Sequence, residues 1–263
     1  MADPNLSHLK LFYTGGGSNS NTTLSIGGAI SSAAVGSQTL TATTTLISGV
    51  TLVNGQLNDP GNGTLTFSPT LKTLSWQPFN GSVGVPVDVS VDGQYFIQGA
   101  SNGGGITVTV VAASLPTSVT TTTITVADVT QQLFLDQTKA ESDAGVTKYH
   151  CFAIKNTHST GDMVSVLAWI IANTPGADTI TIALDSLAAG AGSTGPTAVA
   201  DENTAPSGLT FVSPASSAAV DALAIGTLTA GQCRFIWLKQ FTPSGISVKT
   251  PNNTFKLGWS MRA

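Results

Sequence analysis

Short runs in which apolar and polar residues alternate recur along the whole 263-residue chain. The clearest pair lies within residues 149–178, where YHCFAI is followed by a turn-like stretch at 156–162 and by the apolar run Met163–Ala172. Successive side chains of a strand point to opposite faces, so a period of two indicates strands. No segment longer than about eight residues shows the 3.6-residue period of a helix. The sequence therefore predicts an all-β protein with a β-hairpin at residues 149–178.

A block rich in Thr, Val and Gly extends from about residue 39 to residue 127. Of the 24 charged residues in the chain (10 Lys and Arg, 14 Asp and Glu), only Asp59, Lys72, Asp88 and Asp92 fall in it. Short alternating runs recur here at roughly ten-residue spacing, with turn signals such as Asn-Gly and Asp-Gly between them. This spacing predicts a small immunoglobulin-like β-sandwich over residues 39–128.

Residues 1–38 are too few to form a domain, yet they precede this block. We therefore predict that residues 1–38 and 129–263 together form one discontinuous, jelly-roll-like β-sandwich into which residues 39–128 are inserted. The segment 24–30 contains Gly27 and Gly28. Because glycine lacks a side chain and tolerates positive φ, we expect this segment to approach another backbone closely.

The chain carries few charges, 9% of its residues, and its net charge is −4. Lys and Arg are not clustered, whereas nucleic-acid binding needs a basic stripe, so we expect no nucleic-acid partner. The sequence shows neither a transmembrane run nor the pattern of a signal peptide, which predicts no membrane insertion and assembly in the cytoplasm. In that compartment Cys151 and Cys233, both in apolar runs, are expected to be buried, reduced thiols, with a disulfide as the alternative.

Candidate catalytic and metal-binding residues are few. His150 and Cys151 are adjacent, but neighbours in a strand point to opposite faces and cannot form a nucleophile–base pair. The chain has no G-x-S-x-G motif, and we predict no catalytic residue, no cofactor and no enzymatic activity. Four acidic residues that could contribute to a calcium site lie on or near loops without the spacing of a calcium loop, so they are expected to be exposed and no metal site is predicted: Asp178, Asp185, Asp201 and Glu202.

One tryptophan is a candidate for carbohydrate or receptor contact. All four tryptophans lie in apolar strand-like runs, which favours core positions. Trp76 is followed by Gln77-Pro78 near a predicted turn, where an exposed ring would stack on a sugar. We therefore keep Trp76 as the one candidate contact residue.

Six strand and turn segments resemble a group of virion structural proteins of tailed bacteriophages, of the accessory or decoration type. The resemblance covers residues 6–36 and about 133–260, and the block between them resembles the immunoglobulin-like modules that phage virion proteins often carry. The segments are LSIGGAISS (24–32), YHCFAIKNTH (149–158), WIIANTPGADTITIALD (169–185), ADENTAPSGLTFVSP (200–214), LAIGTLTAGQCRFIWLK (223–239) and NNTFKLGW (252–259).

The resemblance implies a structural protein of the virion, assembled in the host cytoplasm. We expect a capsid decoration protein that binds the major capsid protein and further copies of itself in an oligomer. The alternatives are a tail, neck or baseplate component bound to tail proteins, and a receptor- or carbohydrate-binding module that recognises a host-surface glycan.

Overall fold

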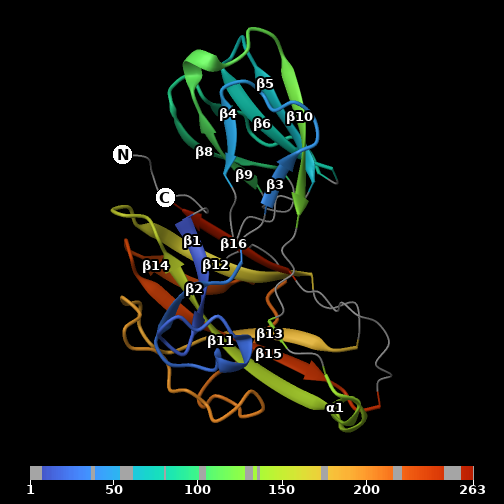
Figure 1. The fold of residues 1–263 in the computed structure, drawn as a ribbon, viewed down its shortest axis with the longest axis vertical. Helices are drawn as coiled ribbons and strands as arrows, with labels where there is room; N and C mark the ends of the chain where they lie inside the picture. Colours follow the sequence, from blue (N-terminus) through green and yellow to red (C-terminus); the bar gives the residue numbers. More distant parts are fainter. Residues whose placement is uncertain are drawn as a thin grey trace. The chain divides into compact units, whose positions relative to one another are not determined.

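The structure is a computed structural model and describes residues 8–36, 39–53, 62–79, 81–100, 105–127, 133–134, 137–172, 177–215, 221–245 and 256–262. Its regular structure is nearly all antiparallel strand, which confirms the all-β prediction. The described residues form two compact units, one within Gly36–Val129 and one that combines His8–Val35 with Thr130–Ala263 (Figure 1). The predicted insert, residues 39–128, lies within the first unit. Within the described residues, no helix is long and apolar enough to cross a membrane.

The first unit, Gly36–Val129, is a β-sandwich of two antiparallel sheets. One sheet has the strand order β3-β10-β5-β6-β7 and the other β4-β9-β8. The elements are β3 (Thr39–Ala42), β4 (Val50–Val53), β5 (Gly63–Ser68), β6 (Thr73–Pro78), β7 (Val87–Asp88), β8 (Gly93–Gln98), β9 (Gly105–Val110), the short 3-10 helix η3 (Ala112–Ser114) and β10 (Thr120–Ala127).

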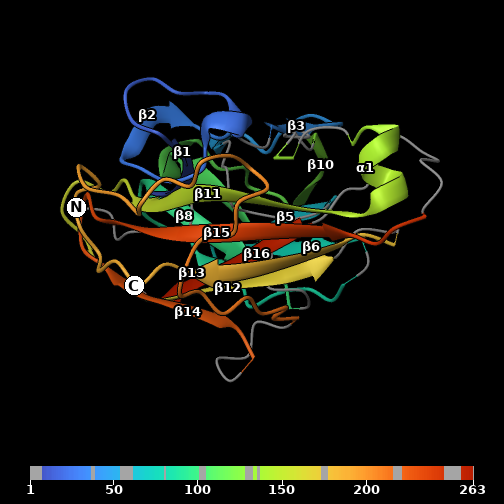
Figure 2. The ribbon, with the colours of Figure 1, turned by 90° about the horizontal axis from the view of Figure 1, so that it is seen from below.

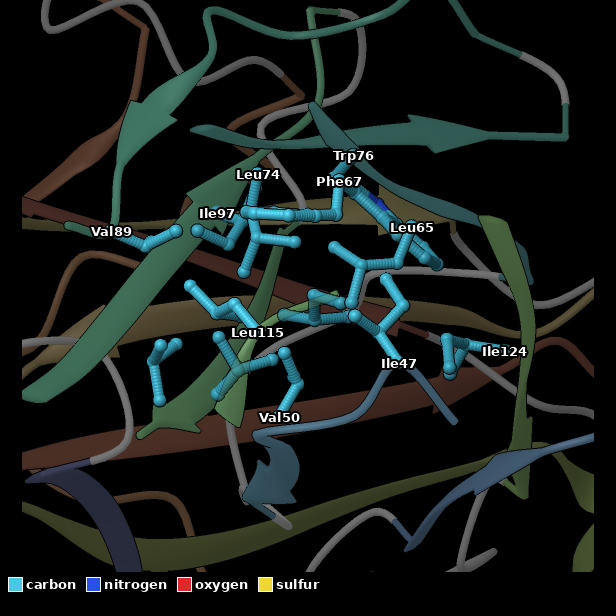
Figure 3. Packing of buried hydrophobic residues seen from close by; sticks show 13 residues of the cluster. Ile47, Val50, Leu65, Phe67, Leu74, Trp76, Val89, Ile97, Leu115 and Ile124 are labelled. Atoms are coloured by element: carbon cyan, nitrogen blue, oxygen red, sulfur yellow. The ribbon is translucent and has the colours of Figure 1, made fainter. Parts of the chain in front are cut away.

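Apolar side chains from both sheets fill the space between them. Leu65 and Phe67 alternate with partly exposed residues along β5, as the period of two requires. They pack with Trp76 of β6 (Figure 3). Ile106 and Val108 of β9 belong to the same core, and all five residues are fully buried. The two inner faces therefore form one core, as in other β-sandwiches.

The strand order of this sandwich differs from that of a constant-type immunoglobulin domain. There, the last strand pairs with the strand before it. Here, the last strand, β10, pairs with β3 and β5, whereas β9 pairs with β4 and β8. The sandwich architecture thus agrees with the prediction, whereas the pairing of the last strand differs from that of a constant-type domain.

The second unit also contains two antiparallel sheets, ordered β13-β15-β11-β1-β2 and β14-β12-β16. Figure 2 shows β13, β15 and β11 side by side. The elements are β1 (Leu9–Thr14), the 3-10 helix η2 (Thr22–Leu24), β2 (Ile30–Ala34), α1 (Lys139–Ala144), β11 (Val146–Asn156), β12 (Met163–Ala172), β13 (Thr179–Leu184), β14 (Leu223–Leu228), β15 (Cys233–Thr242) and β16 (Lys256–Arg262).

Residues from before and after the first unit share one sheet. β1 pairs with β11 from Leu9↔Asn156 to Tyr13↔Phe152. On its other side β11 pairs with β15 along almost its whole length. The N-terminal strand therefore completes a sheet that is otherwise built from residues far along the chain.

The predicted hairpin at residues 149–178 is wrong, although both of its strands exist. β11 lies in the larger sheet and β12 lies in the smaller one, where it pairs with β14 and β16. Residues 157–162 carry the chain from one sheet to the other. Next to the 157–162 connection, over residues 152–155, β11 has no free edge for β12, because β1 and β15 take its two sides there.

The glycines of segment 24–30 allow the close backbone approach expected from the sequence. Gly28 donates its N–H to the Pro196 carbonyl oxygen at 2.7 Å. A Cβ atom on Gly27, whose φ is +109°, would lie 2.8 Å from Cα of Ala198. A Cβ atom on Gly195 would lie 1.7 Å from the Gly28 carbonyl oxygen. The two segments can pack together only without these side chains.

Candidate functional site

Four ionisable side chains meet near the start of β11. The Lys148 Nζ atom lies 2.9 Å from Oε1 of Glu202 and 3.2 Å from Oε1 of Glu141. His150 Nε2 lies 3.4 Å from Oε2 of Glu202. The Lys148 side chain is 3% exposed and that of His150 is 0% exposed. We call these four residues the Lys148 cluster; since charges are seldom buried without partners, it is the most unusual polar site among the described residues.

The capping of helix α1 brings Glu141 into the cluster. The Thr138 side chain accepts a hydrogen bond from the Glu141 N–H at 3.2 Å, and Glu141 Oε2 accepts one from the Thr138 N–H at 2.8 Å. This reciprocal pair is a capping box. It directs one carboxylate oxygen to the helix end and leaves the other, Oε1, for Lys148.

A turn at residues 201–204 supplies Glu202. Asp201 Oδ1 accepts hydrogen bonds from the Asn203 N–H at 3.0 Å and the Thr204 hydroxyl at 2.8 Å, which fixes the turn. The Glu202 carbonyl oxygen accepts a hydrogen bond from the Tyr149 N–H at 2.7 Å. The turn therefore covers the side of β11 that β1 leaves open, because pairing with β1 reaches only Phe152.

Burial and pairing set the charge states of the cluster. Burial alone would lower the pKa of Lys148, but the Glu202 and Glu141 carboxylates outweigh it and raise that pKa overall. The hydrogen bond from the Thr138 backbone lowers the pKa of Glu141. Burial lowers the pKa of His150 from 6.5 to about 4, against the opposing effect of Glu202. At neutral pH the cluster thus holds an ammonium between two carboxylates beside an uncharged imidazole.

These charge states suit a structural clamp better than catalysis. A protonated amine has no free lone pair, so Lys148 is not a nucleophile in this setting. His150 is fully buried and has no route to a proton on a bound substrate. The cluster joins β11, α1 and the 201–204 turn. Sequence reasoning missed it, and the only local signal was the capping-box pattern that begins at Thr138.

His150 and Cys151 lie on opposite faces of β11, as predicted. Cys151 is fully buried with Cys233 and Trp237 on the face away from His150, and burial raises the pKa of its thiol. Cys151 and Cys233 are both free thiols. In the register of β11 with β15, Cys151 lies opposite Trp237 and Cys233 lies opposite Lys155, a separation of about 13 Å that no disulfide can bridge.

The loop carboxylates have structural partners. Asp185 Oδ2 accepts a hydrogen bond from the indole N–H of Trp237 at 3.0 Å, and Asp178 Oδ2 accepts one from the Gln240 amide at 3.0 Å. Of the four, only Asp201 is exposed as predicted; Asp178 is buried, and Asp185 and Glu202 are half-buried. In the described part of the chain, no group of three or more His, Cys, Asp or Glu side chains is placed to hold a metal ion.

The proposed carbohydrate contact at Trp76 is wrong. Its ring is 0% exposed within the core of the first unit (Figure 3), so it has no face on which a sugar would stack. Trp169 and Trp237 are also buried, which confirms the core interpretation for these three residues; the Trp259 side chain lies outside the described part. The exposed aromatic residue near Trp76 is Phe79, which follows β6.

Four large apolar side chains are exposed at one end of the first unit. One lies in the turn between β5 and β6, and the others lie just before β8, just after β9 and just before β10. Three strand pairings show that these loops are at the same end of the unit: Thr120↔Phe67, Thr73↔Asp88 and Gly93↔Val110. The chain enters and leaves the unit at the other end, where Thr39 pairs with Ala127. We call the four residues the apolar tip: Leu71, Val91, Val111 and Val119, between 46% and 68% exposed.

Comparison of the chain with protein-family models, with curated proteins and with solved structures finds no match.

Proposed function

We propose that the chain is a non-enzymatic structural protein of a tailed-phage virion, and specifically a decoration or accessory protein of the capsid. In this proposal the discontinuous unit, His8–Val35 with Thr130–Ala263, anchors the protein to the particle. The unit within Gly36–Val129 is presented to a partner. Support for a virion protein comes from the sequence resemblance of residues 6–36 and 133–260, which covers the proposed anchor.

The position of the apolar tip supports the proposal that one unit anchors the protein and the other binds a partner. Because Thr39 and Ala127 pair at the entry end, the tip loops lie at the end of this unit opposite its two chain connections. A single exposed apolar residue is ordinary, whereas four on loops at the same end of one unit suit a protein interaction site. Loops at one end of a β-sandwich are a common place for binding residues.

The Lys148 cluster is consistent with a rigid second unit, which is the proposed anchor. It joins the 201–204 turn and α1 to β11 without presenting a reactive group to solvent. The partners in this proposal are the major capsid protein and further copies of the chain. Both are assembled in the host cytoplasm.

The number of copies per particle tests the proposal. Quantitative mass spectrometry of purified particles should give tens to hundreds of copies, because a decoration protein follows the repeating capsid lattice. About three, six or twelve copies would instead match a closed ring and favour a tail, neck or baseplate component. Absence from purified particles would refute a virion role.

A receptor-binding module is the second candidate, and the apolar tip is the observation that favours it. Purified protein would then bind host cells or a glycan array, and a Leu71→Ser, Val119→Ser double variant would bind less. Phe79→Ser, which changes an exposed apolar residue outside the tip, is the matched control. Lack of binding by the wild-type protein would remove this candidate.

A further inference from the structure

The Lys148 cluster connects three parts of the chain that are distant in sequence. β11 contributes Lys148 and His150, α1 contributes Glu141, and the 201–204 turn contributes Glu202. Beyond these ion pairs, the turn is held to β11 by the hydrogen bond from the Tyr149 N–H. The cluster is therefore a principal attachment of this turn to the sheet.

We propose that the Lys148 cluster is an acid-sensitive latch, which holds the 201–204 turn and α1 on β11 at neutral pH and releases the turn when the pH falls towards 5. His150 is the sensor. This inference concerns the fold of the second unit and does not depend on the proposed virion role.

Every charged group that faces His150 bears on the latch. Lys148 lies on the same face of β11 and opposes protonation of the imidazole, whereas Glu202 favours it. Glu141 acts through Lys148. On the neighbouring strands Asp178 is bound to Gln240, which lies opposite Lys148 in the β11–β15 register. Towards η2 the ring lies near the backbone of Thr22 and Ser25, and the ring centroid of Phe134 lies 4.9 Å from that of His150.

The geometry shows why a charged imidazole is not accommodated in the closed latch. His150 Nε2 is 3.4 Å from the Glu202 carboxylate, beyond the usual range of a hydrogen bond. That carboxylate already pairs with Lys148 at 2.9 Å. A second positive charge would compete with Lys148 for the Glu202 carboxylate, on a ring that is itself fully buried. In this proposal a charged imidazole gains water when the turn leaves β11.

The size of the effect follows from proton linkage. In the closed state the pKa of His150 is about 4, and in an open, hydrated state it returns towards 6.5. Between these two values the open state binds more protons, so falling pH favours opening. Between pH 7 and pH 5 the opening equilibrium should increase about twentyfold.

Opening would uncover a specific edge of the sheet. The Tyr149 N–H loses its acceptor on Glu202, whereas Phe211, whose ring centroid is 5.6 Å from that of Tyr149, lies beside Val212, which pairs with Ile182 of β13. An uncovered strand edge is a surface for pairing with another strand. The latch would thus couple pH to the exposure of a binding edge on β11.

Hydrogen exchange of the full-length protein at pH 7 and pH 5 tests the latch, with rates corrected for the intrinsic pH dependence of exchange. Protection of peptides that cover residues 146–151 and 199–205 should fall about twentyfold at pH 5. Peptides from β5 and β6, whose core has no buried ionisable group among the described residues, should keep their protection. His150→Phe, which cannot titrate, should abolish the pH dependence at residues 146–151 and 199–205.

The controls separate the latch from a general effect of acid. His150→Gln serves where the phenylalanine variant does not fold, and it should also lack the pH dependence. His158→Gln, in the turn after β11, should behave as the wild type does. The proposal is overturned by a wild-type change below about threefold, by equal loss across β1 and β15, or by His150 variants that keep the wild-type response.

Discussion

The ammonium group of Lys148 lies 2.9 Å from the Glu202 carboxylate, and both side chains are largely shielded from water. Removing the cation leaves two carboxylates without their partner in a site of low polarity. Breaking a buried ion pair in this way typically costs about 3–5 kcal/mol. We therefore expect Lys148→Met to lower the free energy of unfolding of the second unit by that amount in urea denaturation.

Lys139→Met is the matched control for this variant. Lys139 pairs with Asp143 within α1, but both side chains are well exposed. Exposed pairs of this kind contribute about 0.5 kcal/mol or less. A similar loss of stability in both variants would contradict the structural role of the Lys148 cluster.

The buried imidazole of His150 predicts how stability depends on pH. Its pKa is lowered from 6.5 to about 4, so the unfolded chain binds a proton that the folded protein does not. The free energy of unfolding should therefore decrease as pH falls from about 6.5 to about 4, by up to about 3 kcal/mol. Urea denaturation across this range measures the slope, and His150→Phe should flatten it.

Substitution of Trp76 tests whether this residue packs in the core, as its burial indicates, or contacts a ligand. Trp76→Ala should lower the free energy of unfolding by about 3–5 kcal/mol, because it leaves a large cavity between the sheets. Phe79→Ala, at an exposed position three residues later, should change it by no more than about 0.5 kcal/mol. Thermal unfolding measures both. Equal effects would mean that Trp76 is not in the core.

The contact between Gly195 and Gly28 predicts a strict requirement for glycine. A Cβ atom on Gly195 would overlap the Gly28 carbonyl oxygen at 1.7 Å, so Gly195→Ala must displace backbone and should cost about 2–3 kcal/mol. Gly190→Ala, on the same loop, places its Cβ 4.0 Å from the nearest atom and should be neutral. Chemical denaturation of the two variants checks the difference, and a neutral Gly195→Ala would refute the close approach.

The local pattern predicted the all-β class and the positions of strands. The run Met163–Ala172 is a strand over the residues expected from its sequence. The step in charge density near residues 39 and 127 falls close to the edges of the unit Gly36–Val129. Both features can be predicted from residue composition and periodicity, which are properties of the local sequence.

Strand partners could not be predicted in this way. The alternation of apolar and polar residues predicts that β11 and β12 are strands. The same alternation occurs whether two consecutive strands form a hairpin or lie in different sheets. Pairing of β11 with β1 and β15 depends on contacts between distant segments. The Lys148 cluster was missed for the same reason, since Glu202 reaches β11 only through the fold of the 201–204 turn.

Deletion of residues 40–127 tests the central claim, that one unit anchors the protein and the other is presented. Thr39 and Ala127 are paired neighbours, so a short Gly-Ser linker can join the ends that remain. The account predicts that the shortened protein stays folded and binds particles lacking this protein as tightly as the intact chain does. An unfolded product, or a folded product that no longer binds such particles, would contradict it.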